Sequence, residues 1–240
     1  MKDVIFQNWK KTIFSIFILF LGSLVIIFSP NISTSIYDNM IYILTNKWFI
    51  IFTFLAMSFC NLEFMNCTKE VNFVLRSNCL SDYIKRNMMI LIKMVCSFFL
   101  FSLLLAIIGV LVVHFNDLSI NLSVQQICYL LFMIVRTCIL LILTEIILYM
   151  VGWHFSKQST ILFCLLFIVF LLFEIDIMKL DHINQLFPIP LFVTSYFSSG
   201  IFTNFSLELS ASIIQVCILS FVIVLLYYNC FKKEQGEKIR

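Results

Sequence analysis

Long apolar runs separated by short polar stretches make up most of the chain. A bilayer core of roughly 30 Å needs about 20 helical residues, and six runs approach or exceed that length. They cover residues 12–28, 48–65, 89–113, 127–150, 160–175 and 209–228. The first run ends where Pro30 and its polar neighbours stop a helix. The pattern predicts an all-α fold, with residues 1–240 forming one polytopic integral membrane domain of six transmembrane helices.

Composition supports a membrane protein. Apolar residues make up 62% of the 240 residues and charged residues 12%, and the mean hydropathy is +1.04. Water does not solvate such a chain as a globular domain. The nine cysteines lie mostly within the apolar runs and form no C-x-x-C pair, so metal and redox sites lack the spacing they need.

The first apolar run has a competing interpretation as a cleavable signal peptide, because Lys10 and Lys11 precede it. The run is longer than a usual signal core, and no small-x-small cleavage site occurs before Pro30. We therefore expect the run to remain as the first span.

Basic residues set the predicted orientation, because lysine and arginine are retained on the cytoplasmic side of short loops. With the amino terminus inside, 13 of the 16 basic residues face the cytoplasm. Only Lys47 and Lys179 fall outside, and Arg136 lies within a span. Both termini are therefore predicted to be cytoplasmic.

The external side is then acidic, with six carboxylates against two lysines, and it would attract cations. Glu174, Asp176 and Asp181 are the candidate acidic entrance. The alternative is that carboxylates dominate there only because basic residues are kept inside. Before the last span, the proline-containing stretch 187–205 is either a re-entrant segment buried by protein or a surface loop with aromatic anchors.

The loop between the second and third spans is too elaborate for a turn. In residues 66–88, apolar positions recur at near-helical spacing with charged residues between them. This pattern predicts one or two short amphipathic helices at the membrane surface. A helix bound only to lipid is the alternative to a helix that contacts a partner protein.

At this loop the chain resembles the membrane subunits of ABC-2 type ABC transporters. In that family a coupling segment reads as an acidic residue, a hydrophobic stretch, a basic residue, a Ser-containing turn and a lysine leading into span three. The matching positions are Glu70, Arg76, Ser77, Ser81 and Lys93. The six-span layout and the region before the last span are also similar. The resemblance implies that the ATPase subunit is contacted through Glu70, Arg76, Ser81, Lys85 and Arg86.

Two charges lie inside the predicted fourth span, Arg136 and Glu145. Nine residues separate them, which puts them on opposite faces of a helix, so they do not pair within it. Arg136 then needs a partner from another helix or subunit, and Glu145 is expected to lie near enough to the cytoplasm to be hydrated. Each is either a structural polar clamp or a substrate-path residue.

No phosphate-binding loop or hydrolase motif occurs, so the chain is not expected to be an enzyme by itself or to bind a cofactor or metal. The resemblance implies a permease subunit in a bacterial cell membrane, with ATP and magnesium on a partner ATPase and a second permease subunit completing the transporter. Its small size is most similar to the subgroup that exports peptides or confers lantibiotic immunity, with a cationic, amphipathic peptide as substrate and no role for nucleic acid. A stand-alone immunity or assembly protein and a secondary transporter are the alternatives.

Overall fold

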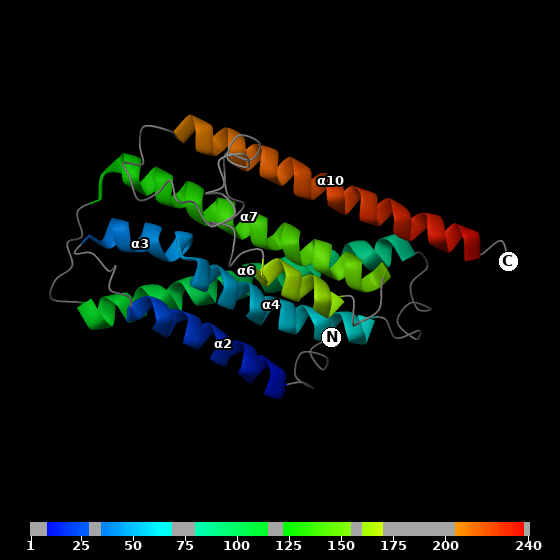
Figure 1. Ribbon diagram of the computed structural model, residues 1–240, viewed down its shortest axis with the longest axis horizontal. Coiled ribbons are helices and arrows are strands. Elements are labelled where there is room, and N and C mark those ends of the chain that lie inside the picture. The colour runs from blue at the N-terminus through cyan, green and yellow to red at the C-terminus, as the bar shows by residue number, and fades with distance from the viewer. Residues whose placement is uncertain are drawn as a thin grey trace.

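A bundle of helices is formed by residues 9–28, 35–68, 80–114, 122–154, 160–169 and 205–237, which are the residues that the computed structural model describes (Figure 1). The elements are α2 (Trp9–Ile27), α3 (Ile36–Thr45), α4 (Lys47–Thr68), α6 (Leu80–His114), α7 (Val124–His154), the helix Thr160–Val169 and α10 (Phe205–Glu237). Each of the six predicted spans contains or overlaps one of these helices, and α3 is additional.

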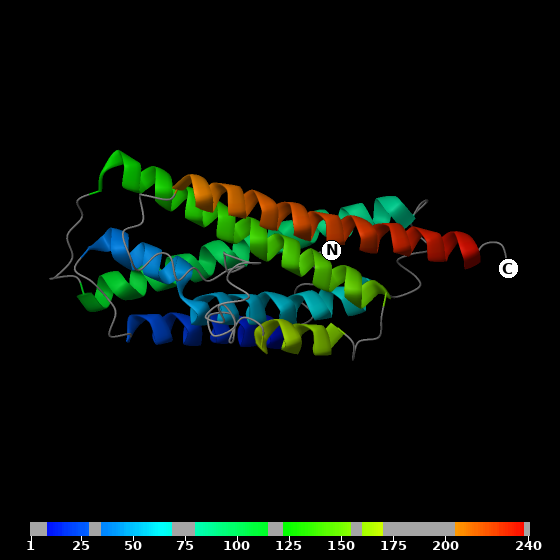
Figure 2. The same ribbon diagram turned by 45° about the horizontal axis from the view of Figure 1, so that its top comes forward.

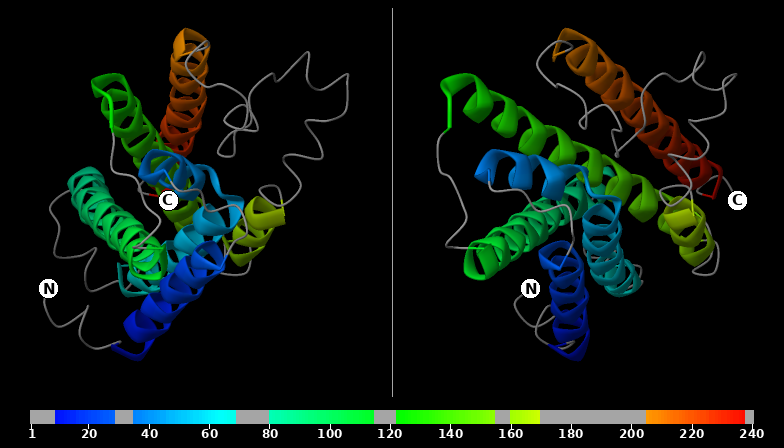
Figure 3. Two further views of the ribbon diagram at one scale, coloured as in Figure 1. Left: turned by 90° about the vertical axis from the view of Figure 1, so that its left-hand side faces the viewer. Right: turned by 60° about the vertical axis from the view of Figure 1, so that its left-hand side comes forward.

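Successive helices run in alternating directions along the long axis of the bundle, if α3 and α4 are taken together (Figures 1 and 2). α2 packs along α4, and α10 packs chiefly along α7. α2 and α10 lie at opposite margins of the bundle (Figure 3). We call the end at which α6 begins and α4, α7 and α10 finish the basic end, because Lys85 and Arg86 are exposed there.

Three helices in the described part of the chain are long and apolar enough to cross a membrane: Tyr83–Val113, Val124–Trp153 and Ser212–Asn229. α3 and α4 bend by 53° at their junction and make a fourth if they form one broken span. The apolar helices Ile13–Ile27 and Thr160–Val169 are shorter. The described helices thus support three or four crossings, and the count of six stays a prediction.

α3 is a helix that the apolar pattern did not predict, because its 10 residues are too few for a membrane span. Local hydrogen bonds define both of its ends. The Ser35 hydroxyl accepts a hydrogen bond from the Asp38 amide (3.4 Å), and Asp38 lies in the first turn, where a negative charge is favourable. Asn46 is extended and ends α3, and its side chain accepts from the amide of Trp48 (2.9 Å). This asparagine therefore stops one helix and caps the next.

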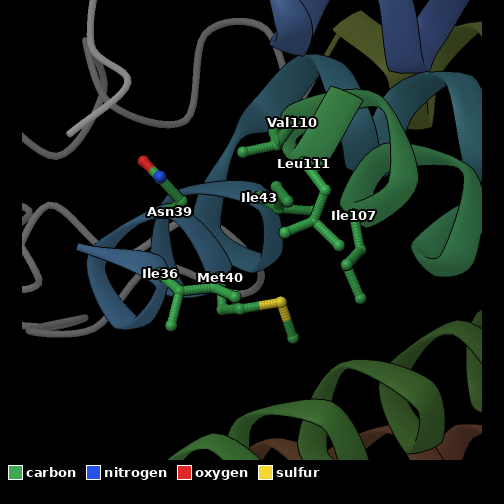
Figure 4. Close-up of a pocket in the computed structure, with 7 residues that line it drawn as sticks. All are labelled: Ile36, Asn39, Met40, Ile43, Ile107, Val110 and Leu111. Carbon is green, nitrogen blue, oxygen red and sulfur yellow. The ribbon is translucent and has the colours of Figure 1, made fainter. Parts of the chain in front are cut away.

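The far end of α6 supports α3. Seven residues line the small space between the two helices: Ile36, Asn39, Met40, Ile43, Ile107, Val110 and Leu111. In Figure 4 the side chains of Ile43, Ile107 and Leu111 lie close together between the two helices, whereas Asn39 points away from them. Apolar contact thus holds α3 at the end of the bundle opposite to the basic end.

The start of α6 differs from the expected separate surface helix. Residues 69–79 lie outside the described part of the chain, but from Leu80 onward the chain is one helix of 35 residues. Ile84, Leu91 and Val95 are all buried along one face, and their packing holds the segment in the bundle. At about 1.5 Å per residue, α6 is about 52 Å long and exceeds the hydrocarbon thickness of a bilayer.

Candidate functional site

A buried carboxyl group, that of Glu145, is the centre of the main polar cluster in the described bundle. Its side chain is 0% exposed. Ser58 Oγ on α4 donates to Glu145 Oε1 (2.7 Å), and Asn61 Nδ2 donates to Oε2 (2.7 Å). Asn61 Nδ2 also donates to the backbone oxygen of Glu145 (3.0 Å). The cluster therefore joins α4 to α7 by three hydrogen bonds.

Cys164 brings a third helix to this cluster. The thiol is buried and lies near Ser58 and Glu145. Together Ser58, Asn61, Glu145 and Cys164 form what we call the carboxyl cluster. It contains one acidic side chain, and no group of three or more His, Cys, Asp or Glu side chains gathers anywhere in the described part of the chain.

A second polar contact lies one turn nearer the basic end. Asn87 Nδ2 on α6 donates to the hydroxyl of Tyr149 on α7 (3.1 Å), and both residues are buried. Tyr149 and Tyr83 both contact the ring of Trp153, with centroids 6.2 Å apart in each pair. Aromatic rings of this kind gather at membrane–water interfaces.

Arg136 lies deeper in the bundle and contacts a different helix. Its side chain is 6% exposed, and its Nη2 donates to Oε1 of Gln215 on α10 (3.2 Å). The prediction that its partner comes from another helix is confirmed, and the partner is a side-chain amide. Arg136 and Glu145 do not pair with each other, because they face α10 and α4 respectively.

The expectation that Glu145 is hydrated from the cytoplasm is wrong. The side chain is fully buried, and its two carboxyl oxygens accept hydrogen bonds from protein groups. The physical reason is that Ser58 and Asn61, polar residues within the second apolar run, face the same layer of the bundle. Asparagine and glutamine within an apolar run form hydrogen bonds across helices in membranes. That signal is also present at Gln215, and it would have identified both polar contacts.

Of the expected coupling residues, the structure describes three. Lys85 and Arg86 are exposed near the start of α6, and Ser81 lies in the first turn of that helix. Glu70 and Arg76 lie outside the described residues. So does the expected acidic entrance of Glu174, Asp176 and Asp181, and so does the expected re-entrant region except for Phe205, the first residue of α10.

The chain matches no protein-family profile, no curated protein and no solved structure. Its function is therefore inferred from the residues and their arrangement.

Proposed function

We propose that this chain is the membrane-spanning subunit of an ABC-2 type ABC transporter, working with a separate ATPase subunit. The observation that carries the proposal is the exposed basic pair Lys85 and Arg86 at the start of α6. This pair belongs to the coupling segment expected from the sequence. It lies on a helix that continues without a break along the bundle.

The geometry offers a route by which a partner would act on the membrane helices. Lys85 and Arg86 face outward, whereas Ile84 and Asn87 on the same turns face inward. Asn87 is hydrogen-bonded to Tyr149 (3.1 Å), so α6 is tied to α7 near this end. A force applied to the basic pair would therefore move the ends of both helices together.

In this proposal the basic end is cytoplasmic, both chain termini lie on that side, and the chain crosses the bacterial cell membrane six times. Two permease subunits and two ATPase subunits form the working transporter. The substrate is a cationic, amphipathic peptide exported or cleared from the membrane, because the proposed external loops are rich in carboxylates.

The test is co-purification of the tagged chain in lipid nanodiscs with an ATPase encoded beside it, followed by ATPase measurements. We expect the chain to stimulate ATP hydrolysis. The double variant Lys85→Glu/Arg86→Glu should lose both the complex and the stimulation, whereas the charge-preserving control Lys85→Arg/Arg86→Lys should keep them. Full stimulation by the charge-reversed variant would contradict the coupling role of this pair.

A secondary transporter is the second candidate, because an ionisable residue buried in the membrane, here Glu145, often belongs to an ion pathway. The two candidates separate in proteoliposomes that contain the chain alone. Peptide transport driven by a proton gradient without any ATPase would favour the secondary transporter, and transport only with an ATPase and ATP would favour the ABC transporter.

A further inference from the structure

The coupling proposal leaves the buried carboxyl group without a role. We propose that Glu145, Ser58 and Asn61 form an intramembrane proton-binding site, in which Glu145 carries a proton while α4 and α7 are packed together. The inference concerns the chain by itself and holds for either candidate function.

Charge is the first argument. Glu145 is 0% exposed, and no basic side chain in the described ranges forms an ion pair with it. Lys85 and Arg86 on α6 are exposed, and Arg136 on α7 binds Gln215 instead. The titratable group that faces Glu145 from the helix Thr160–Val169 is the thiol of Cys164, which adds no positive charge. A carboxylate in such surroundings is strongly disfavoured, and a bound proton removes the charge.

Hydrogen bonding is the second argument. The Asn61 amide is oriented by the backbone oxygen of Glu145, which only accepts, so Asn61 Nδ2 serves as a donor to both that oxygen and Oε2. The Ser58 hydroxyl is reversible. It donates to a carboxylate, and its oxygen can instead accept from a protonated Glu145. The cluster therefore offers the protonated carboxyl group an acceptor at Ser58 and a donor at Asn61.

The third argument concerns the side-chain oxygen of Asn61 and the distance of the site from each end of α7. Asn61 Oδ1 is buried and accepts no hydrogen bond from any described residue. When α4 and α7 separate, this oxygen can accept a hydrogen bond from a water molecule or hydronium ion beside Glu145. Glu145 lies nine residues from the end of α7 at His154 and 21 from its start at Val124. At about 1.5 Å per residue these are about 14 Å and 32 Å, so exchange is expected at the basic end.

This arrangement couples protonation to helix packing. With the proton bound, α4, α7 and the helix Thr160–Val169 close over a neutral, hydrogen-bonded group. Loss of the proton leaves a buried charge, which is relieved only if α4 and α7 part and water enters. A change that separates these two helices would therefore release a proton, and rebinding of the proton would favour their closure.

The experiment uses the purified full-length chain in lipid nanodiscs, without any ATPase. A hydrophobic carbodiimide reacts with protonated carboxylic acids in apolar surroundings, and the modified residue is identified by peptide mass spectrometry. We expect modification at Glu145 at neutral pH, falling about tenfold per pH unit once the group ionises. A water-soluble carbodiimide with an added amine should instead modify the exposed Asp38 and leave Glu145 unmodified.

One variant and one spectroscopic measurement make the result decisive. Glu145→Gln resembles the protonated group in shape and charge, so its thermal stability should match that of the parent chain at about pH 4, where a carboxyl group is protonated in both the folded and the unfolded state. The variant should lack the decline in stability that the parent chain shows as the pH rises from about 4.3 through neutrality. Infrared difference spectra between low and high pH should show the carbonyl band of a buried protonated acid in the parent chain and not in this variant. If Glu145→Gln fails to fold, the labelling of the parent chain still decides.

Absence of the hydrophobic label at Glu145 at every pH, with Asp38 modified normally by the soluble reagent, would overturn the proposal. Since no ATPase is present, that result would leave the coupling proposal standing. Loss of ATPase coupling in the Lys85 and Arg86 variants, in turn, says nothing about the proton.

Discussion

Replacing Gly22 with alanine tests the closest approach between α2 and α4. A Cβ atom at this position would lie 2.7 Å from Phe52 Cβ and 3.1 Å from its Cγ. Because Phe52 Cβ is fixed to the backbone, the two helices must move apart by about 1 Å to reach ordinary van der Waals separation. Overpacking of this kind costs about 1–3 kcal/mol, and the better helix propensity of alanine recovers about 1 kcal/mol. We expect Gly22→Ala to lower the free energy of unfolding by up to about 2 kcal/mol.

Gly109 provides the matched control on α6. There the new methyl group would meet Cδ1 and Cγ1 of Ile27, which move with the rotation of that side chain and are not fixed to the backbone. Turning Ile27 away from its preferred rotamer costs about 0.5–1.5 kcal/mol. The helix propensity gain of about 1 kcal/mol offsets that loss. Gly109→Ala should therefore leave stability nearly unchanged.

The assay is reversible unfolding by sodium dodecyl sulfate in mixed micelles, followed by tryptophan fluorescence. Phe52→Ala should not relieve the penalty at Gly22, because alanine keeps the Cβ atom that causes the overlap. Phe52→Gly should relieve it, as measured by a double-mutant cycle. The reasoning is refuted if Gly22→Ala is more stable than the parent chain, or if Gly109→Ala is the more destabilised of the two.

Two further predictions concern the contacts between other helices, and a third concerns the topology of the chain. Gln215→Leu removes an acceptor of Arg136 and should reduce the free energy of unfolding by about 0.6–2 kcal/mol, measured in the same micelles, with a smaller loss when Arg136→Leu is added. The sulfur atoms of Cys96 and Cys138 lie 3.9 Å apart, so mild oxidation should join α6 to α7 by a disulfide detected by peptide mass spectrometry, and a serine at either position should prevent it. Fluorescent protein fused to either terminus should be fluorescent in cells, because both termini are predicted to be cytoplasmic; periplasmic reporter activity at one terminus would contradict this.

The apolar pattern was sufficient to predict most of the helices, because a membrane helix must satisfy its backbone within one continuous segment. It predicted the start of α7 to within three residues, since the apolar run begins at Ile127 and the helix at Val124. The exact start is set by local hydrogen bonds. The Gln126 amide donates to Ser123 Oγ (3.2 Å), and the Ser123 amide donates back to Gln126 Oε1 (2.8 Å).

The candidate site was predicted only in part, because hydropathy identifies charges within a span but not their partners. Arg136 and Glu145 stood out as charges in an apolar run, and both proved to be buried. Asn61 and Gln215 were not predicted as site residues, since one amide hardly changes the mean hydropathy of a span. Which helices face each other depends on packing between segments far apart in the sequence, and a single sequence carries no direct record of that packing.

The two polar contacts show why α7 is central to the described bundle. About 100° of rotation per residue places Arg136 and Glu145 on opposite faces of this helix, so one faces α10 and the other α4. In lipid, apolar helix surfaces gain little by meeting each other rather than acyl chains, so hydrogen-bonded polar pairs help to fix how a helix is rotated against its neighbour. α10 packs chiefly on α7 and is apolar and exposed along much of its length, and the hydrogen bond of Gln215 to Arg136 helps to fix the register of this contact. Protonation of Glu145 would therefore strengthen the packing of α7 against α4, and the contact of α7 with α10 would not change. A movement driven from the basic end would then carry α7 and α10 as one unit.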